Sequence, residues 1–379
     1  MQIIDRTYEE YKMDYPIERI CDPAGALFID IETTGLSKET TSLYLIGCGY
    51  YTEKGFSTKL FFADSSAEEQ WILEEFILFS RSYTHLFHFN GTGFDIPYLG
   101  YKAALYDIPD PFSGMTNVDI YKMCKPLRYL LFPDSMKQKS IENFLGVGRQ
   151  DRFNGGELIE VYKQYEKNPD DELLELLITH NREDVLGMHR ILPILYYLDL
   201  KDAHLFYEGY NINRYKDYNG EEKEEVLFDY RTDATFPKSF MAKTESMYVH
   251  ASAETQKISI RLPIYNTVLK IYFENYRDYC YIPDEDRALL KTIAQTLPKE
   301  RYRKATRDTC YQNVSAGFVK QPGDIFTPVF RSSLKDKKKY FRFPEDFNEK
   351  AAETFGRELL CVFFTMKKRP HLSNASFFS

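Results

Sequence analysis

The spacing of apolar residues in the first half of the chain alternates between the patterns of strands and of helices. Short apolar runs predict strands at 26–31, 42–51, 58–63, 84–89 and 118–120. Apolar residues at helical spacing predict helices at 67–81, at 94–106, and from 140 to about 200. Strands and helices that alternate in this way are typical of an α/β fold, here with a mixed sheet.

The second half of the chain has a different pattern. Apolar residues alternate with polar ones over 258–262 and over 269–273, which predicts antiparallel strands with one face in water. Asp284 follows Pro283 and is expected to cap a helix that runs to about 297. A last helix is expected over 345–364. These elements predict a C-terminal α+β domain.

Length and charge both favour two domains. A chain of 379 residues is long for one domain, and the acidic stretch 217–225 is interpreted as a boundary loop. We therefore expect one domain at 20–200 and another at 215–379. The first 200 residues carry 19 basic and 32 acidic residues, whereas the remainder carries 30 and 25. The overall net charge of −8 argues against a protein that coats nucleic acid by bulk charge, but it does not exclude local binding.

Composition excludes several classes of protein. The chain contains no apolar run of the roughly 18 residues that a membrane helix needs, so we expect no membrane partner. Its first residues lack a basic segment followed by an apolar one, so we expect no signal peptide. The six cysteines lie far apart without a CxxC pair, which argues against a zinc ribbon or a disulfide framework. Together these features predict a cytoplasmic protein.

Acidic residues at three places in the first half could carry chemistry. Asp30 and Glu32 end the first predicted strand, and residues two apart on a strand point to the same face. Asp95 follows a Gly-rich turn near the start of a predicted helix, and His180 precedes Asp184 by one helical turn. Each has a plainer interpretation when taken alone: a solvated strand end, a helix-capping Asp and a surface His–Asp pair.

The three places together resemble a known family. DIETTG at 30–35, FNGTGFDIPYL at 89–99 and HNREDV at 180–185 are similar, in this order, to the three motifs of the DEDD exonuclease superfamily. Residues 25–200 resemble more closely the YprB-type ribonuclease-H-like domain. The shared features there include the Asn-Gly-x-x-Phe-Asp-x-Pro run and counterparts of Asp119, 140–142 and 155–159. The resemblance covers just under half of the chain.

This resemblance implies a fold and an activity. The fold is a ribonuclease-H-like mixed sheet with flanking helices, and the activity is 3′→5′ exonuclease hydrolysis of DNA or RNA. The partner would be a nucleic acid, either single-stranded or at its 3′ end. The metal ligands implied are Asp30, Glu32, Asp95 and Asp184, holding two divalent ions, Mg²⁺ or Mn²⁺. The chemistry agrees independently, because phosphodiester cleavage suits two hard cations bound by carboxylates.

One residue departs from the family pattern. The tyrosine subtype has a Tyr four residues before the last Asp, and the histidine subtype has a His five residues before it. This chain has Thr179 five residues before Asp184 and His180 four residues before it. A neutral His can still accept a proton from water, so His180 is the expected general base.

Substrate contacts are expected in both halves of the chain. Thr33, Asn90 and Phe94 lie within the motifs, and Lys335, Lys337 and Lys338 lie in a basic stretch followed by aromatic residues. Basic and aromatic side chains together suit single-stranded nucleic acid, although a solvated face is the plainer interpretation. Two other functions stay open: a structure-selective endonuclease on the same fold, and a nucleic-acid-binding or scaffold module with little turnover.

Overall fold

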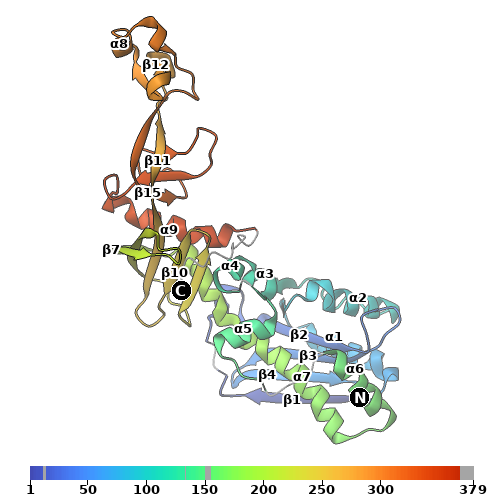
Figure 1. Ribbon diagram of the computed structural model, residues 1–379. Helices are drawn as coiled ribbons and strands as arrows, with labels where there is room; N and C mark the ends of the chain where they lie inside the picture. Colours follow the sequence, from blue (N-terminus) through green and yellow to red (C-terminus); the bar gives the residue numbers. More distant parts are fainter. Residues whose placement is uncertain (12–13, 133, 150–154, 368–379) are drawn as a thin grey trace. The chain divides into compact units, whose positions relative to one another are not determined.

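The computed structural model describes residues 1–11, 14–132, 134–149 and 155–367 (Figure 1). The chain forms two compact units. The first contains Met1–Arg128 and Asp134–Tyr196, and the second contains the chain from Tyr197 onward together with the short segment that begins at Tyr129. None of the helices in the described ranges has the length and apolarity that a membrane crossing requires.

The first unit is built on a six-stranded mixed sheet with the strand order β1-β4-β3-β2-β5-β6. The strands are β1 (Gln2–Tyr8), β2 (Ala26–Thr33), β3 (Leu43–Thr52), β4 (Gly55–Phe62), β5 (His85–His88) and β6 (Thr116–Asp119). The pairs β1–β4, β3–β4 and β2–β3 are antiparallel, whereas β5 and β6 run parallel to β2. The predicted mixed sheet is therefore confirmed, with β1 as an additional edge strand.

Helices cover both faces of this sheet (Figure 1). They are α1 (Glu69–Ser80), α2 (Asp95–Leu105), α3 (Ile120–Cys124), α5 (Gln138–Leu145), α6 (Gly155–Lys167) and α7 (Asp171–Arg190), and the short α4 (Arg128–Leu131) lies between α3 and α5 in the sequence. Ile29 and Ile31 of β2 pack in one core with α1 and α2. Tyr44, Leu60 and Phe62 pack in another with α6 and α7. The even-numbered residues of β2 therefore face the α7 side.

Two glycines of β3 allow α7 to approach the sheet closely. A Cβ atom at Gly47 would lie 1.9 Å from Asn181 Oδ1, and one at Gly49 would lie 2.7 Å from Val185. Real carbon atoms do not come this close, so a side chain at either position would force the helix away. The missing side chains thus place Asn181 of α7 directly against β2 and β3.

The second unit is rich in β structure. Its larger sheet has eight strands: β7 (Leu205–Lys216), β8 (Glu222–Thr232), β9 (Phe240–Thr244), β10 (Met247–Ala251), β11 (Lys257–Tyr272), β15 (Tyr311–Gln321), β16 (Phe330–Arg331) and β17 (Lys339–Arg342). A smaller sheet has three: β12 (Tyr279–Ile282), β13 (Arg287–Leu290) and β14 (Arg303–Lys304). The described part of the unit also contains α8 (Lys291–Ala294), α9 (Glu349–Thr365) and most of α4. The last helix is thus present as predicted.

Three sequence expectations for this unit need correction. The alternating segments 258–262 and 269–273 belong almost entirely to one continuous strand, β11. The helix expected from Asp284 to about 297 is instead a 3₁₀ turn, strand β13 and the four-residue α8. The stretch 217–225 contains the turn between β7 and β8, so it lies inside the second unit rather than at its boundary.

Candidate active site

The two acidic residues of β2 both reach α7. Asp30 Oδ2 accepts a hydrogen bond of 2.8 Å from Asn181 Nδ2, and the same amide lies 3.3 Å from the backbone oxygen of Asp30. Glu32 Oε1 lies 3.7 Å from His180 Nε2. The spacing of two along the strand therefore places both carboxylates beneath the same helix, and Asp30 is not a solvated strand end.

Asp95 is the first residue of α2, directly after a tight turn. Asn90 adopts a left-handed conformation with φ of 62° at the start of that turn. A Cβ atom at Gly91 would lie 3.0 Å from Asp95 Oδ2, so this glycine leaves room for the carboxylate. Burial raises the pKa of Asp95 to about 6, against backbone hydrogen bonds at Asp95 and Ile31 that lower it. The Asp184 carboxylate raises this pKa further.

His180 and Asp184 lie on one face of α7. The distance from His180 Nε2 to Asp184 Oδ2 is 3.3 Å. His180 is only 5% exposed, so the interpretation as a surface pair is wrong. Glu32, His180 and Asp184 can each offer one ligand atom such that these atoms lie within 4.8 Å of one another. One imidazole nitrogen and two carboxylate oxygens form a donor set suited to a divalent cation.

The four acidic residues repel one another. The pKa of Asp30 is well above its ordinary value, first because the group is buried and then because the carboxylates of Asp184, Glu32 and Asp95 are near. Arg149 opposes this shift. Like charges held together in a buried place are costly unless cations neutralise them. Their convergence therefore fits the binding of divalent cations.

Sequence reasoning missed Arg149. Its guanidinium contacts Asp184 Oδ1, and its Nε lies 2.7 Å from Glu142 Oε2. Glu142 lies in the segment 140–142, which resembles part of the YprB-type domain, but the sequence predicts no role for it. Arg149 and Asp184 are 35 residues apart in the sequence, so no local pattern of the chain connects them.

The three expected substrate contacts of the first unit all take part in local structure. The Thr33 hydroxyl donates a hydrogen bond of 2.7 Å to the backbone oxygen of Gly35. The backbone N–H of Asn90 donates to Asp119 Oδ1 at 3.1 Å, and the half-buried ring of Phe94 packs against Tyr98. Asp119 also accepts a hydrogen bond from the backbone N–H of Lys122 and so caps α3.

The expected lysines belong to the second unit. Lys335, Lys337 and Lys338 are exposed in the segment between β16 and β17. Lys339, which begins β17, is paired with Asp324 at 2.8 Å. Lys338 also lies close enough to the partly buried Lys320 to help burial lower the pKa of that lysine. The segment therefore concentrates positive charge.

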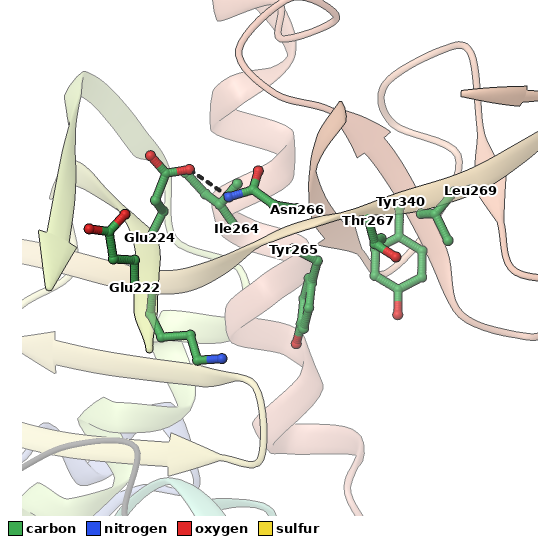
Figure 2. Close-up of a pocket in the computed structure, with 9 residues that line it drawn as sticks. Glu222, Glu224, Ile264, Tyr265, Asn266, Thr267, Leu269 and Tyr340 are labelled. Carbon is green, nitrogen blue, oxygen red and sulfur yellow. Dashed lines mark hydrogen bonds between the residues drawn. The ribbon is translucent and has the colours of Figure 1, made fainter. Parts of the chain in front are cut away.

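A pocket of about 320 Å³ lies beside β17 (Figure 2). The rings of Tyr265 and Tyr340 meet edge to face along its wall, with centroids 5.8 Å apart. The opposite wall is acidic, and there Glu224 accepts a hydrogen bond of 2.8 Å from Asn266. Its lining comes from β8, β11 and β17: Glu222, Lys223, Glu224, Ile264, Tyr265, Asn266, Thr267, Leu269 and Tyr340. Lys335, Lys337 and Lys338 therefore come just before Tyr340 of the pocket wall in the sequence.

Comparison with solved structures finds nucleic-acid enzymes. A family B DNA polymerase from the hyperthermophilic archaeon Pyrobaculum calidifontis is 18% identical over 46% of this chain and 25% of its own, with a TM-score of 0.37. A zinc-bound E. coli ExoI–ssDNA complex is 12% identical over 54% of each chain, with a TM-score of 0.27. The chain therefore spans a quarter of the polymerase and about half of the exonuclease.

Comparison with protein families identifies the first unit. No curated protein matches the chain. Residues 27–196 match the sequence profile of a family described as the RNase_H superfamily, and this range covers β2 to β6 and the helices up to α7. The matched range contains the four carboxylates, His180 and Arg149. Residues 27–196 are therefore an RNase H-like domain, to which the C-terminal part of the chain adds a β-rich region.

Proposed function

We propose that the chain is a metal-dependent 3′→5′ exonuclease that hydrolyses phosphodiester bonds of DNA or RNA. The observation that supports this most is the grouping of Asp30, Glu32 and Asp184 at α7, with Asp95 near enough to add to the raised pKa of Asp30. A site with only a structural role would not need four neighbouring acids. Catalytic cations bound to these carboxylates would offset their mutual repulsion and so account for the arrangement.

The residues of the site have different roles in the proposed hydrolysis. When bound, two divalent cations would supply charge stabilisation for the attacking and leaving oxygens. Asp30, Glu32, Asp95 and Asp184 would hold these cations. Asn181 fixes the Asp30 carboxylate through its 2.8 Å hydrogen bond. His180 Nε2, which faces Glu32 and Asp184, would accept the proton of the attacking water.

Cleavage of end-labelled oligonucleotides tests this proposal. We expect 5′-labelled DNA or RNA to shorten stepwise from a free 3′ end in Mg²⁺ or Mn²⁺, and a blocked 3′ end to stop the reaction. EDTA should abolish it, because four carboxylates without their cations cannot neutralise the developing charge. Cleavage that persists in EDTA, or that proceeds from the 5′ end, would contradict the proposal.

The same assay separates the alternatives. Cutting of a circular single strand would identify a structure-selective endonuclease, because such a substrate has no end. Binding of the labelled strand without any metal-dependent release of mononucleotides would identify a binding or scaffold module.

We propose further that the second unit helps to hold the substrate. Substituting Lys335, Lys337 and Lys338 by Gln is expected to raise KM while leaving kcat largely unchanged, because the proposed metal ligands and general base all belong to the first unit and these lysines to the second. The logarithmic salt dependence of single-strand binding should become shallower by about 2, since each lost phosphate contact contributes about 0.7. Fluorescence anisotropy at several salt concentrations in EDTA measures this slope.

Lys339→Gln is the matched control for that experiment. Its ammonium group is already paired with Asp324, so removing it should alter the salt slope less than removing one of the exposed lysines. An unchanged slope in the triple variant would mean that the segment is only a solvated face.

A further inference from the structure

The two oxygens of the Asp184 carboxylate face different partners. Oδ2 lies 3.3 Å from His180 Nε2, on the side where Glu32 can also offer a ligand oxygen. Oδ1 is in contact with the Arg149 guanidinium instead. One oxygen therefore points into the cluster of possible metal ligands, while the other is held by a cation of the protein itself.

Arg149 is in turn held by buried groups. Its Nε lies 2.7 Å from Glu142 Oε2, and Glu142 is only 1% exposed. Glu142 Oε1 accepts a hydrogen bond of 2.9 Å from Gln138 Nε2, and this amide also donates to the backbone oxygen of Asp184 at 2.9 Å. Gln138 of α5 thus binds the backbone of Asp184, and Arg149, in the segment after α5, binds its carboxylate.

Close packing of two helices makes these contacts possible. A Cβ atom at Gly187 would lie 2.2 Å from Glu142 Oε1 and 2.6 Å from Gln138 Nε2. A side chain at position 187 would therefore displace the Glu142 carboxylate and the Gln138 amide from their places beside Asp184. Gly187 and the side chains of Gln138, Glu142 and Arg149 thus surround one carboxylate, that of Asp184.

Stability alone is a poor reason for such an arrangement. Burial raises the pKa of Glu142 despite its Arg149 partner, so ionising this group inside the protein is costly. Buried ion pairs often contribute no net stability compared with apolar residues of similar volume. An ion pair that instead fixes the orientation of a functional carboxylate has a separate reason to be present.

We infer that Arg149 is a positioning residue for Asp184: held by Glu142, it binds Oδ1 so that Oδ2 faces Glu32 and His180 as a metal ligand. The inference rests on the proposed function, since it requires that Asp184 binds metal. Arg149 itself would touch neither the cation nor the reacting atoms. Its planar fork reaches two carboxylates at once, which a Lys ammonium group cannot do with the same geometry.

Mn²⁺ binding to the full chain, measured by electron paramagnetic resonance without nucleic acid, tests the inference. Arg149→Lys keeps the charge but loses the fork, and we expect it to lower Mn²⁺ affinity about 10-fold or more, the usual effect of losing a partner that orients a ligand. The double variant Arg149→Met/Glu142→Gln removes the pair without leaving a buried charge alone. It should show a similar loss, with a melting temperature near that of the wild type.

Two further variants separate positioning from general disturbance. Arg190→Lys alters another arginine of the same region, which donates to the backbone oxygen of Gly148 at 3.2 Å, and it should leave Mn²⁺ affinity unchanged. In an Asp184→Asn background, Arg149→Lys should have no further effect, because Arg149 acts through Asp184. Additive losses in that background would overturn the inference.

The outcomes also distinguish this inference from the proposed function. Unchanged or higher Mn²⁺ affinity in Arg149→Lys, with nuclease activity intact in the wild type, would refute the positioning role alone. Wild-type protein that binds Mn²⁺ with the expected dependence on Arg149 but cleaves no nucleic acid would refute only the nuclease proposal. Wild-type protein that binds no Mn²⁺ would overturn both.

Discussion

Asp30→Asn is expected to reduce cleavage to the level that the wild-type protein shows in EDTA. The substitution removes a carboxylate from the centre of the proposed metal site, where Asp184, Glu32 and Asp95 are its neighbours. The local structure should persist, because an amide oxygen at position 30 can still accept the hydrogen bond from Asn181 Nδ2. Single-turnover cleavage of a labelled oligonucleotide in Mg²⁺ measures the effect.

The same variant should be more stable than the wild type when no metal is present. The pKa of Asp30 is raised in the folded chain, so the unfolded chain releases this proton at lower pH than the folded chain does. Ionisation of Asp30 therefore costs stability. The advantage of Asp30→Asn should be absent well below pH 3.8, should grow as the pH rises toward the raised pKa, and should then stay constant.

Divalent metal should reverse the order of stabilities. Binding to the folded state stabilises it in proportion to affinity, and the wild type binds more tightly. Melting temperatures of both proteins across pH, with EDTA and with Mg²⁺, test this reversal. Glu53→Gln is the control, since this exposed residue lies in the turn between β3 and β4. Full activity of Asp30→Asn would remove the basis for the metal site.

His180→Ala is expected to lower kcat by roughly 10²–10⁴-fold, the usual contribution of a general base. The imidazole lies beside Glu32 and Asp184, where it could accept a proton from water, whereas alanine cannot. Substrate binding should be largely kept. At saturating metal, kcat of the wild type should rise with pH, because the base acts in its unprotonated form, and kcat of the variant should lack this rise.

His180→Tyr distinguishes a base from a ligand. A Tyr at this position matches the spacing of the tyrosine subtype, so it should restore part of the rate that Ala loses. If His180→Ala instead lowers Mn²⁺ affinity and keeps the pH profile, His180 is a metal ligand. If the variant keeps both kcat and its pH profile, His180 has only a structural role.

Sequence patterns predicted the first unit well because its signals are local. Asp30 and Glu32 follow a buried apolar run, and Asp95 follows a Gly-rich turn, so short windows predict both the elements and their ends. His180 and Asp184 share a helix face because they are four residues apart. The order of the three motifs then led to the prediction, which no single window supports, that these elements belong to one site.

The supporting contacts could not be predicted in this way. Arg149 meets Asp184 in the segment after α5, and Gly187 leaves room there for the Glu142 and Gln138 side chains, which no periodicity of the sequence reveals. Asn181 reaches Asp30 because Gly47 leaves space on a different strand. Contacts of this kind depend on three elements at once, so they become visible only in the folded chain.

The second unit was predicted less well for a physical reason. The helix expected after Asp284 is interrupted at Asp286, which adopts a left-handed conformation with φ of 45°. Its carboxylate accepts hydrogen bonds from the hydroxyls of Tyr281 and Tyr311, which lower its pKa to about 2. Tyr311 is 25 residues away, so a distant partner overrides the local helix signal here.

Strand β11 makes much of the second unit depend on one segment of backbone. Residues 257–264 pair with β8, and part of this range also pairs with β10, whereas residues 265–272 pair with β15. Separating β15 would expose backbone groups of the same strand that organises β8 and β10. We therefore expect the two halves of the large sheet to unfold together, and a substitution that breaks β11 in either half to destabilise the pairings of both.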